Sequence, residues 1–344
     1  IRDIYEDNEN NIWVATFGGG LIQIIENVFH QPFDAEWLKQ QSITQLFRDS
    51  EGSVWLGIDK GIFKTSEHSN KSKYQYYHLG GNEISAITED PNGKIWIGTT
   101  TSGIYSLSKG SSNFSPVYSS SDKLGNANNS ILATQEGVFV STKAGLMKFS
   151  LSGNFLYKLT TIDGLPHNNI NYCFEDSNGR IWIATQGNRV AYLKNRLIQF
   201  VEEGNEQTIV DVNHILEDTK GRLWFATMGQ GIAVLDGNTV YSLNTENGLP
   251  TNYCYQMVLD NDENVWVSHQ KSLTQLSPDL KVNRIVNPEE LAPTENSMVS
   301  FLFKDKEGSI WISSTHNVVK FNPFIDKSSK APPTLTVNSM RVFD

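Results

Sequence analysis

The chain has 344 residues, more than one compact domain usually holds, which leaves either two domains or one repeat architecture. Its formal net charge is −10 and it has no long run of Lys or Arg, so nucleic acid is not an expected partner. No apolar stretch approaches the roughly 18 residues of a membrane-spanning helix. Only Cys173 and Cys254 could form a disulfide, which excludes a disulfide scaffold and a multi-cysteine metal site.

An Asp followed six residues later by a Trp recurs along the chain at intervals of about 42 residues. The interval between Trp96 and Trp182 is twice as long, and we predict a degenerate unit between them with Phe139 in the Trp position. The chain then has eight units. In chain order the intact pairs are Asp7/Trp13, Asp49/Trp55, Asp90/Trp96, Asp176/Trp182, Asp218/Trp224, Asp260/Trp266 and Asp305/Trp311.

Each unit contains the pattern of four short strands. In the third unit, an apolar first strand precedes Asp90, a tight turn ends at Gly93, and a buried run follows over residues 95–99. A Gly-rich connection leads to a third strand, and a more polar fourth strand forms the outer edge. Four antiparallel strands at this period predict an all-β fold, a β-propeller of four-stranded antiparallel blades.

In such a fold the repeated Trp packs between neighbouring blades, and the repeated Asp is a turn residue. Cys173 and Cys254 occupy different apolar positions of units two apart, which places them too far from each other for a disulfide. We therefore predict two buried free thiols.

The string over residues 84–107 resembles the two component regulator propeller repeat, and residues 164–168 and 248–252 resemble the loop that leads into it. The resemblance implies a propeller over residues 1–325. It also implies a linker and the first strands of an incomplete Tyr-rich Ig-like domain over residues 326–344. Propellers of this family often have seven blades. The alternative to eight blades is thus seven, with the first unit belonging to a neighbouring propeller.

The resemblance further implies a periplasmic, ligand-sensing domain of a hybrid two-component histidine kinase whose kinase is absent from this chain. The ligand would be an extracellular oligosaccharide. The resemblance predicts no enzyme activity, no cofactor and no metal in this chain, contact with a membrane only through flanking segments, and a homodimer of the parent receptor.

A ligand is expected at one face of the ring, where the connections between second and third strands and those leading into each unit emerge. Trp37, the one Trp outside the repeated position, would stack on a sugar ring, and Arg, Gln and Asn would donate to its hydroxyls. The predicted ligand-binding residues are Trp37, Lys60, Gln186, Asn188, Arg189, Gln230, His269, Lys271 and His316.

Two other functions stay open on the sequence. Streptogramin lyases are similar propellers that use a loop histidine with a metal, and His269 or His316 would be the base here. A two-histidine metal site at these positions lacks further ligands in the sequence. The chain could also be a non-catalytic scaffold that holds a protein partner.

Overall fold

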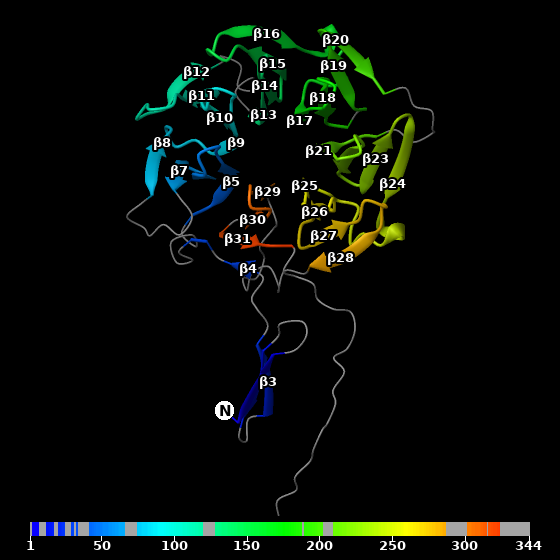
Figure 1. The fold of residues 1–344 in the computed structure, drawn as a ribbon. Helices are drawn as coiled ribbons and strands as arrows, with labels where there is room; N and C mark the ends of the chain where they lie inside the picture. The colour runs from blue at the N-terminus through cyan, green and yellow to red at the C-terminus, as the bar shows by residue number, and fades with distance from the viewer. Residues whose placement is uncertain are drawn as a thin grey trace, which may run out of the picture.

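Each repeat unit folds into one antiparallel sheet. The computed structural model describes residues 2–6, 12–16, 20–24, 29–30, 32–33, 41–65, 74–119, 128–187, 189–201, 209–286, 301–314 and 316–323. These residues form one three-stranded and seven four-stranded sheets. The four-stranded sheets, numbered here as blades 1 to 7, are arranged around a common axis (Figure 1). The prediction of an all-β propeller is confirmed.

Within each blade the first strand lies nearest the axis and the fourth lies at the rim (Figure 1). The blades are β5(Ile43–Arg48), β6(Val54–Ile58), β7(Gly61–Thr65), β8(Gln75–His78); β9(Ile84–Glu89), β10(Ile95–Thr99), β11(Ile104–Leu107), β12(Ser115–Tyr118); β13(Asn128–Thr134), β14(Gly137–Thr142), β15(Gly145–Phe149), β16(Phe155–Leu159); β17(Ile170–Glu175), β18(Ile181–Thr185), β19(Ala191–Lys194), β20(Leu197–Phe200); β21(Val212–Glu217), β22(Leu223–Thr227), β23(Ile232–Asp236), β24(Thr239–Leu243); β25(Met257–Leu259), β26(Val265–Ser268), β27(Leu273–Leu276), β28(Val282–Val286); and β29(Phe301–Lys304), β30(Ile310–Ser314), β31(Asn317–Phe321), β4(Phe29–His30).

Two short 3-10 turns, η2(Thr161–Asp163) and η3(Thr245–Asn247), precede the first strands of blades 4 and 6. Each begins at a capping residue whose side chain accepts a backbone N–H, and each ends at a glycine in the left-handed region, Gly164 or Gly248. No helix in the described ranges is long and apolar enough to cross a membrane.

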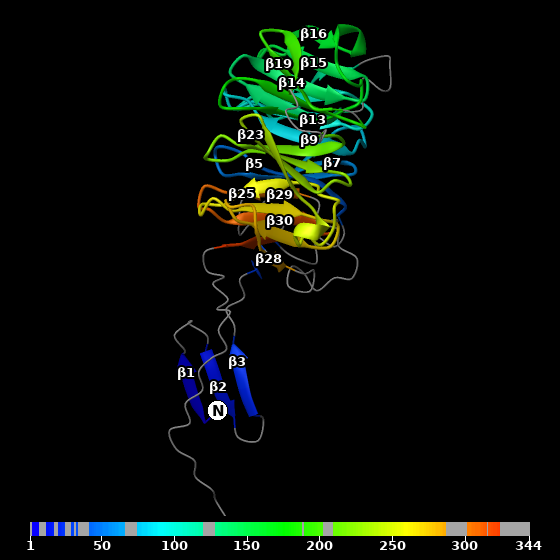
Figure 2. The ribbon, with the colours of Figure 1, turned by 90° about the vertical axis from the view of Figure 1, so that its right-hand side faces the viewer.

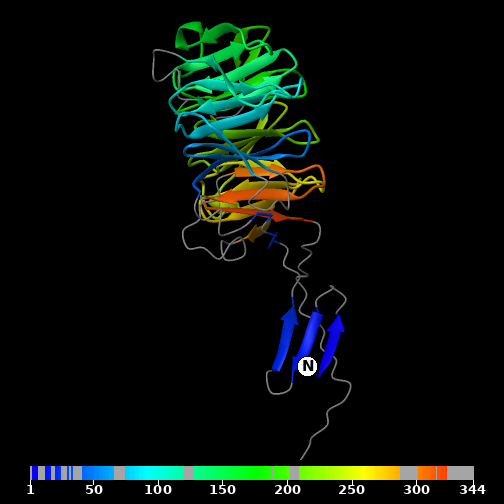
Figure 3. The ribbon, with the colours of Figure 1, turned by 90° about the vertical axis from the view of Figure 1, so that its left-hand side faces the viewer.

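The first unit does not enter the ring as a blade. Its strands β1(Asp3–Glu6), β2(Ile12–Thr16) and β3(Gly20–Ile24) form the three-stranded sheet, which stands apart from the ring in the two side views (Figure 2 and Figure 3). The chain thus has eight units but a ring of seven blades, and the seven-blade alternative holds instead of a ring of eight. The structure describes nothing of residues 324–344, so the expected Ig-like strands at 326–344 lie outside it.

The fourth strand of the first unit closes the ring. In Figure 1 the blue β4 lies beside the red β31, and the two pair through Lys320 with His30 and Phe321 with Phe29. Blade 7 therefore takes three strands from the C-terminal unit and its outer strand from the N-terminal unit. This exchange explains why eight sequence units make seven blades.

A hydrogen bond between side chains explains the six-residue spacing of Asp and Trp. One carboxylate oxygen of Asp218 accepts the indole N–H of Trp224 at 2.8 Å, and the other accepts the backbone N–H of Arg222 at 3.0 Å. One buried Asp thus fixes both the turn and the orientation of the indole. The same pair of bonds occurs in blades 1, 2, 4, 6 and 7 at Asp49/Trp55, Asp90/Trp96, Asp176/Trp182, Asp260/Trp266 and Asp305/Trp311.

The Trp side chains pack between blades, as predicted. Trp224 of blade 5 lies in one apolar cluster with Met257 and Val265 of blade 6, and Trp311 of blade 7 lies in one with Ile43 and Leu46 of blade 1. The six described Trp side chains at this position are buried, and that of Trp13 lies outside the description. The degenerate unit is confirmed as blade 3, with Phe139 buried in the Trp position. Cys173 and Cys254 are buried free thiols, as predicted.

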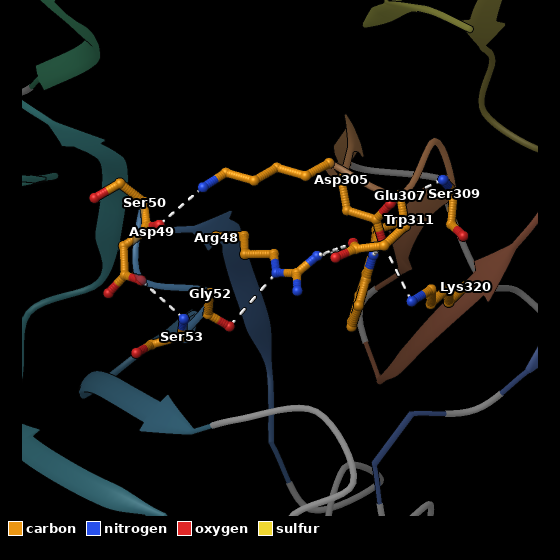
Figure 4. A network of polar contacts seen from close by, with 11 residues as sticks. Arg48, Asp49, Ser50, Gly52, Ser53, Asp305, Glu307, Ser309, Trp311 and Lys320 are labelled. Atoms are coloured by element: carbon orange, nitrogen blue, oxygen red, sulfur yellow. Dashed lines mark hydrogen bonds and ion pairs between the residues drawn. The ribbon is translucent and has the colours of Figure 1, made fainter. Parts of the chain in front are cut away.

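Polar contacts join neighbouring blades at the face that carries the Asp turns, called here the turn face. The residue after the Asp of one blade meets the residue before the Asp of the next, as where the N–H and hydroxyl of Ser177 donate to Glu217. At the closing joint the residue before the Asp of blade 1, Arg48, instead forms ion pairs with blade 7 (Figure 4). There Arg48 of blade 1 lies 2.7 Å from Glu307 and 3.4 Å from Asp305 of blade 7.

Candidate functional site

The predicted ligand-binding residues lie at the opposite end of the blades from the Asp turns. Lys60, Gln186, Arg189, Gln230, His269, Lys271 and His316 all belong to connections between second and third strands, and we call this end the loop face. Because strands alternate in direction, these connections emerge at the same end of every blade. Trp37 and Asn188 lie outside the described residues, so their predicted contacts stay predictions.

Three of the predicted residues are brought together on blades 4 and 5. The side-chain oxygen of Gln186 accepts from the amide of Asn169 at 2.7 Å. Arg189 forms a β-bridge with Val210, whose backbone N–H donates to the side-chain oxygen of Gln230 at 3.4 Å. Gln186, Arg189 and Gln230 therefore border one continuous stretch of loops.

Two contacts hold this stretch in shape. The carboxylate of Asp211, a residue with φ of 51°, accepts the backbone N–H of Gly187. The guanidinium of Arg189 lies 5.0 Å from the ring centroid of Phe200, close enough for a cation–π contact. The Arg189 side chain is thus positioned by an aromatic ring and is exposed to solvent.

Tyr253 adds an exposed aromatic ring next to these residues. It forms a β-bridge with Met228, which lies in the same connection as Gln230. Tyr253 is 53% exposed and Met228 is 37% exposed, which are large exposed fractions for an aromatic and an apolar side chain. Tyr253 was not among the predicted residues, because it lies in the string Asn-Tyr-Cys, where the neighbouring Cys254 occupies a buried strand position. We define the loop-face patch as Gln186, Arg189, Met228, Gln230 and Tyr253.

His269 does not face solvent. It is 1% exposed, its Nε2 lies 2.9 Å from the hydroxyl of Thr274, and its Nδ1 lies 3.1 Å from the carbonyl oxygen of Tyr253. Burial lowers the pKa of His269, and the backbone contact with Tyr253 only partly offsets that effect. An enclosed imidazole of this kind supports the backbone under Tyr253 instead of contacting a ligand.

The other predicted residues lie apart from the loop-face patch. His316 is exposed, and its Nδ1 lies 2.7 Å from the carbonyl oxygen of Gln41. The carbonyl oxygen of Lys60 accepts from the hydroxyl of Tyr76 at 2.8 Å, while the Lys60 and Lys271 side chains are exposed. Across the described ranges, no three His, Cys, Asp or Glu side chains are grouped so as to hold a metal ion.

Two cavities lie between blades, and neither is lined by a predicted residue. One, of about 290 Å³, lies between blades 1 and 2 near Asp49 and Lys109. The other, of about 490 Å³, lies between blades 4 and 5 near Arg180 and Asn238. These cavities could not be predicted from the sequence, because the space between two blades depends on how their turns of different length pack together.

The sequence comparison identifies a type of repeat in four stretches of the chain. The family model described as "Two component regulator propeller" matches residues 1–18, 78–101, 164–187 and 208–229. No curated protein sequence matches the chain. The structure is similar to the extracellular domain of a putative hybrid two component system from B. thetaiotaomicron, with 23% identity and a TM-score of 0.78. That match covers 99% of this chain but 49% of the other, so this chain spans about half of that structure.

Lyase propellers share the fold at lower identity. A streptogramin B lyase matches with 15% identity and a TM-score of 0.68, over 86% of this chain and 97% of the other. A virginiamycin B lyase from Staphylococcus aureus matches with 13% identity and a TM-score of 0.68, over 85% and 97%. At such identities these likenesses show the fold alone. The fold and the matched stretches together show that this chain is a seven-bladed propeller with two component regulator propeller repeats in four stretches.

Proposed function

We propose that this chain is the ligand-sensing propeller of the extracytoplasmic part of a hybrid two component receptor. The observation that carries the proposal is the match of four stretches of the chain to a repeat described by its occurrence in two component regulators. The similar structure from B. thetaiotaomicron, which is described as an extracellular domain, supports the same location. We propose the periplasm as the compartment, a histidine kinase outside this chain as the output, and a homodimer as the state of the parent receptor.

The proposed ligand is an extracellular oligosaccharide that binds the loop-face patch. A sugar presents an apolar C–H face and a rim of hydroxyls, and it needs an aromatic platform next to polar side chains. Tyr253 offers the platform, and Gln186, Gln230 and Arg189 offer donors and acceptors. Arg189 and the Gln186 amide oxygen are already oriented by Phe200 and Asn169, which lowers the entropy lost on binding.

Calorimetric titration with a panel of neutral oligosaccharides tests this proposal. We expect saturable binding without turnover, weakened about fivefold or more by Tyr253→Ala, because losing a stacking aromatic removes on the order of 1 kcal/mol or more. Tyr241→Ala is the matched control: Tyr241 is also exposed, but it lies on the outer strand β24 of blade 5. Binding that survives Tyr253→Ala unchanged would move the site away from the patch.

Other outcomes of the same experiment favour the competing functions. Product formation from a ligand, abolished by His269→Ala, would overturn the sensor proposal in favour of a lyase-like enzyme. Failure of every saccharide to bind, together with association that depends on protein concentration, would favour an interaction scaffold.

A further inference from the structure

The residue four positions after the Asp bridges two inter-blade clefts at the turn face. Between blades 5 and 6, the guanidinium of Arg222 donates to the carbonyl oxygen of Pro278 at 2.9 Å. Between blades 2 and 3, the ammonium of Lys94 donates to the carbonyl oxygen of Leu151 at 2.7 Å. In both clefts the acceptor belongs to the turn between the third and fourth strands of the next blade. A cation from one blade thus meets an oxygen from its neighbour.

In the cleft between blades 4 and 5 the cationic side chain is present, but no carbonyl oxygen of the described residues in the next blade accepts a hydrogen bond from it. Arg180 occupies the same position, its Nε donates to Asp176 at 2.5 Å, and its guanidinium lies 5.1 Å from the ring of Trp182 and 5.4 Å from that of Tyr192. No residue of the described ranges accepts from its terminal nitrogens. The Arg180 side chain is 29% exposed, against 10% for Arg222.

Turn length explains the difference. In blades 3 and 6 the turn between third and fourth strands runs over residues 150–154 and 277–281. In blade 5 Asp236 pairs directly with Thr239, which leaves only Gly237 and Asn238 in the turn. The short turn brings no carbonyl oxygen to Arg180, and the 490 Å³ cavity occupies this space.

The cavity wall has the chemistry of a binding site for an acidic sugar. It is lined by Arg180, Trp182, Tyr192, Gln199, Leu235 and Asn238, among others. Its volume is in the range of small-ligand pockets. The terminal N–H groups of a guanidinium favour a carboxylate over a neutral acceptor, and the two amides suit hydroxyl groups.

The acidic side chains near this cavity already accept hydrogen bonds from other groups of the protein. Asp176 accepts from Trp182, from Arg180 and from two backbone N–H groups, and Glu217 accepts both the N–H and the hydroxyl of Ser177. Their charges therefore stabilise the blade joint, and the guanidinium edge is the group presented to the cavity. We propose that the cleft between blades 4 and 5 is a second saccharide site, which binds a uronic acid residue with its carboxylate on Arg180. This inference rests on the proposed function, since it takes a saccharide as the ligand.

Titration with digalacturonate, and with digalactose as its neutral counterpart, tests the site. We expect wild-type protein to bind digalacturonate, and Arg180→Gln to weaken that binding about 10- to 100-fold, as expected for a lost charge-assisted hydrogen bond. Arg222→Gln is the matched control, since Arg222 has the same Asp and Trp partners but donates to Pro278. It should bind digalacturonate like the wild type.

A second variant separates binding from folding. Replacing the turn Gly237–Asn238 by the five residues 277–281 of blade 6 should supply Arg180 with a carbonyl oxygen and fill the cleft. We expect this graft to keep the melting temperature and lose digalacturonate binding. Unchanged binding in the graft or in Arg180→Gln would overturn the inference.

The outcomes of these experiments distinguish failure of the second site from failure of the proposed function. If neutral oligosaccharides bind and Tyr253→Ala weakens them, but digalacturonate does not bind, the proposed function stands and the second site is wrong. If no saccharide of either kind binds the wild type, both are wrong.

Discussion

At the residue scale, one Asp carboxylate fixes the turn and the indole in six of the seven blades, and blade 3 has no such Asp. Burial raises the pKa of Asp218, but hydrogen bonds from the Trp224 indole, the Arg222 backbone N–H and the Arg222 guanidinium outweigh it, so the pKa lies below its ordinary value. Asp176 and Asp305 have lowered pKa values through the same kinds of contact. The ionised Asp is therefore the form that the fold stabilises at neutral pH.

Replacing Trp224 by Phe tests this pairing. The substitution removes the indole N–H and leaves one oxygen of the buried Asp218 with fewer donors, so we expect a loss of about 1 to 3 kcal/mol in the free energy of unfolding. Urea denaturation measures it. Phe139→Trp is the reverse substitution in blade 3, which has no Asp in its turn, and it should destabilise by leaving an indole N–H without an acceptor. A stabilised Phe139→Trp variant would contradict this account.

His214 makes stability depend on pH. Its ring packs against that of Tyr172 with centroids 4.5 Å apart and planes tilted by 34°, and its Nδ1 has no hydrogen-bond partner in the described part of the chain. Burial lowers the pKa of His214 to about 4. The unfolded chain therefore takes up a proton near the ordinary pKa of 6.5 while the folded chain does not, so stability falls as pH decreases from about 6.5 to 4.

The expected loss over this interval is about 1 to 3 kcal/mol, and His214→Gln should remove most of it. Thermal or urea unfolding at several pH values measures the slope. His269, whose pKa burial also lowers, adds a smaller slope of the same sign that this variant keeps. His78→Gln, at an exposed position on β8, is the control. A His214→Gln protein with the wild-type slope would show that folding does not lower the pKa of this imidazole.

At the scale of elements, the start of the third strand depends on glycine. Gly103 has φ of 93°, and a Cβ there would lie 2.1 Å from the carbonyl oxygen of Tyr118. Gly103→Ala should therefore cost about 2 to 4 kcal/mol, through both strain and displacement of β12. Gly110→Ala is the matched control, with φ of 80° and no atom within 4 Å, and should cost about 1 kcal/mol. Equal costs in urea denaturation would exclude the contact with Tyr118 as the cause.

The elements were largely predictable because their residues repeat. The spacing of Asp and Trp marks the turn and second strand of every intact unit, and Phe139 marks the degenerate one. The bond between Asp and Trp was not predictable, since spacing alone does not tell where two side chains meet. The loop-face residues do not repeat, so the sequence could not pair Gln186 with Asn169 or turn His269 inward onto Thr274.

At the scale of the whole molecule, the number of blades depends on one short strand. The fourth strands differ in sequence from blade to blade, and nothing in the sequence of β4 indicates that it joins β31 instead of β3. Pairing with β31 links the two ends of the ring, and the network of Arg48, Asp305 and Glu307 holds the same joint at the turn face (Figure 4). Ring closure is therefore a long-range contact, between segments nearly 300 residues apart.

Two N-terminal deletions test the closure. Removing residues 1–24 takes away β1–β3 and leaves β4, so the ring should keep its melting temperature. Removing residues 1–30 also takes away β4, which leaves the edge of β31 unpaired and blade 7 with three strands. We expect the longer deletion to melt about 5 °C or more below the shorter one, and to associate through the open edge as its concentration rises. Because the two proteins differ by only six residues around β4, identical melting curves would mean that the inter-blade packing of Trp311 and the Arg48 network close the ring without the strand.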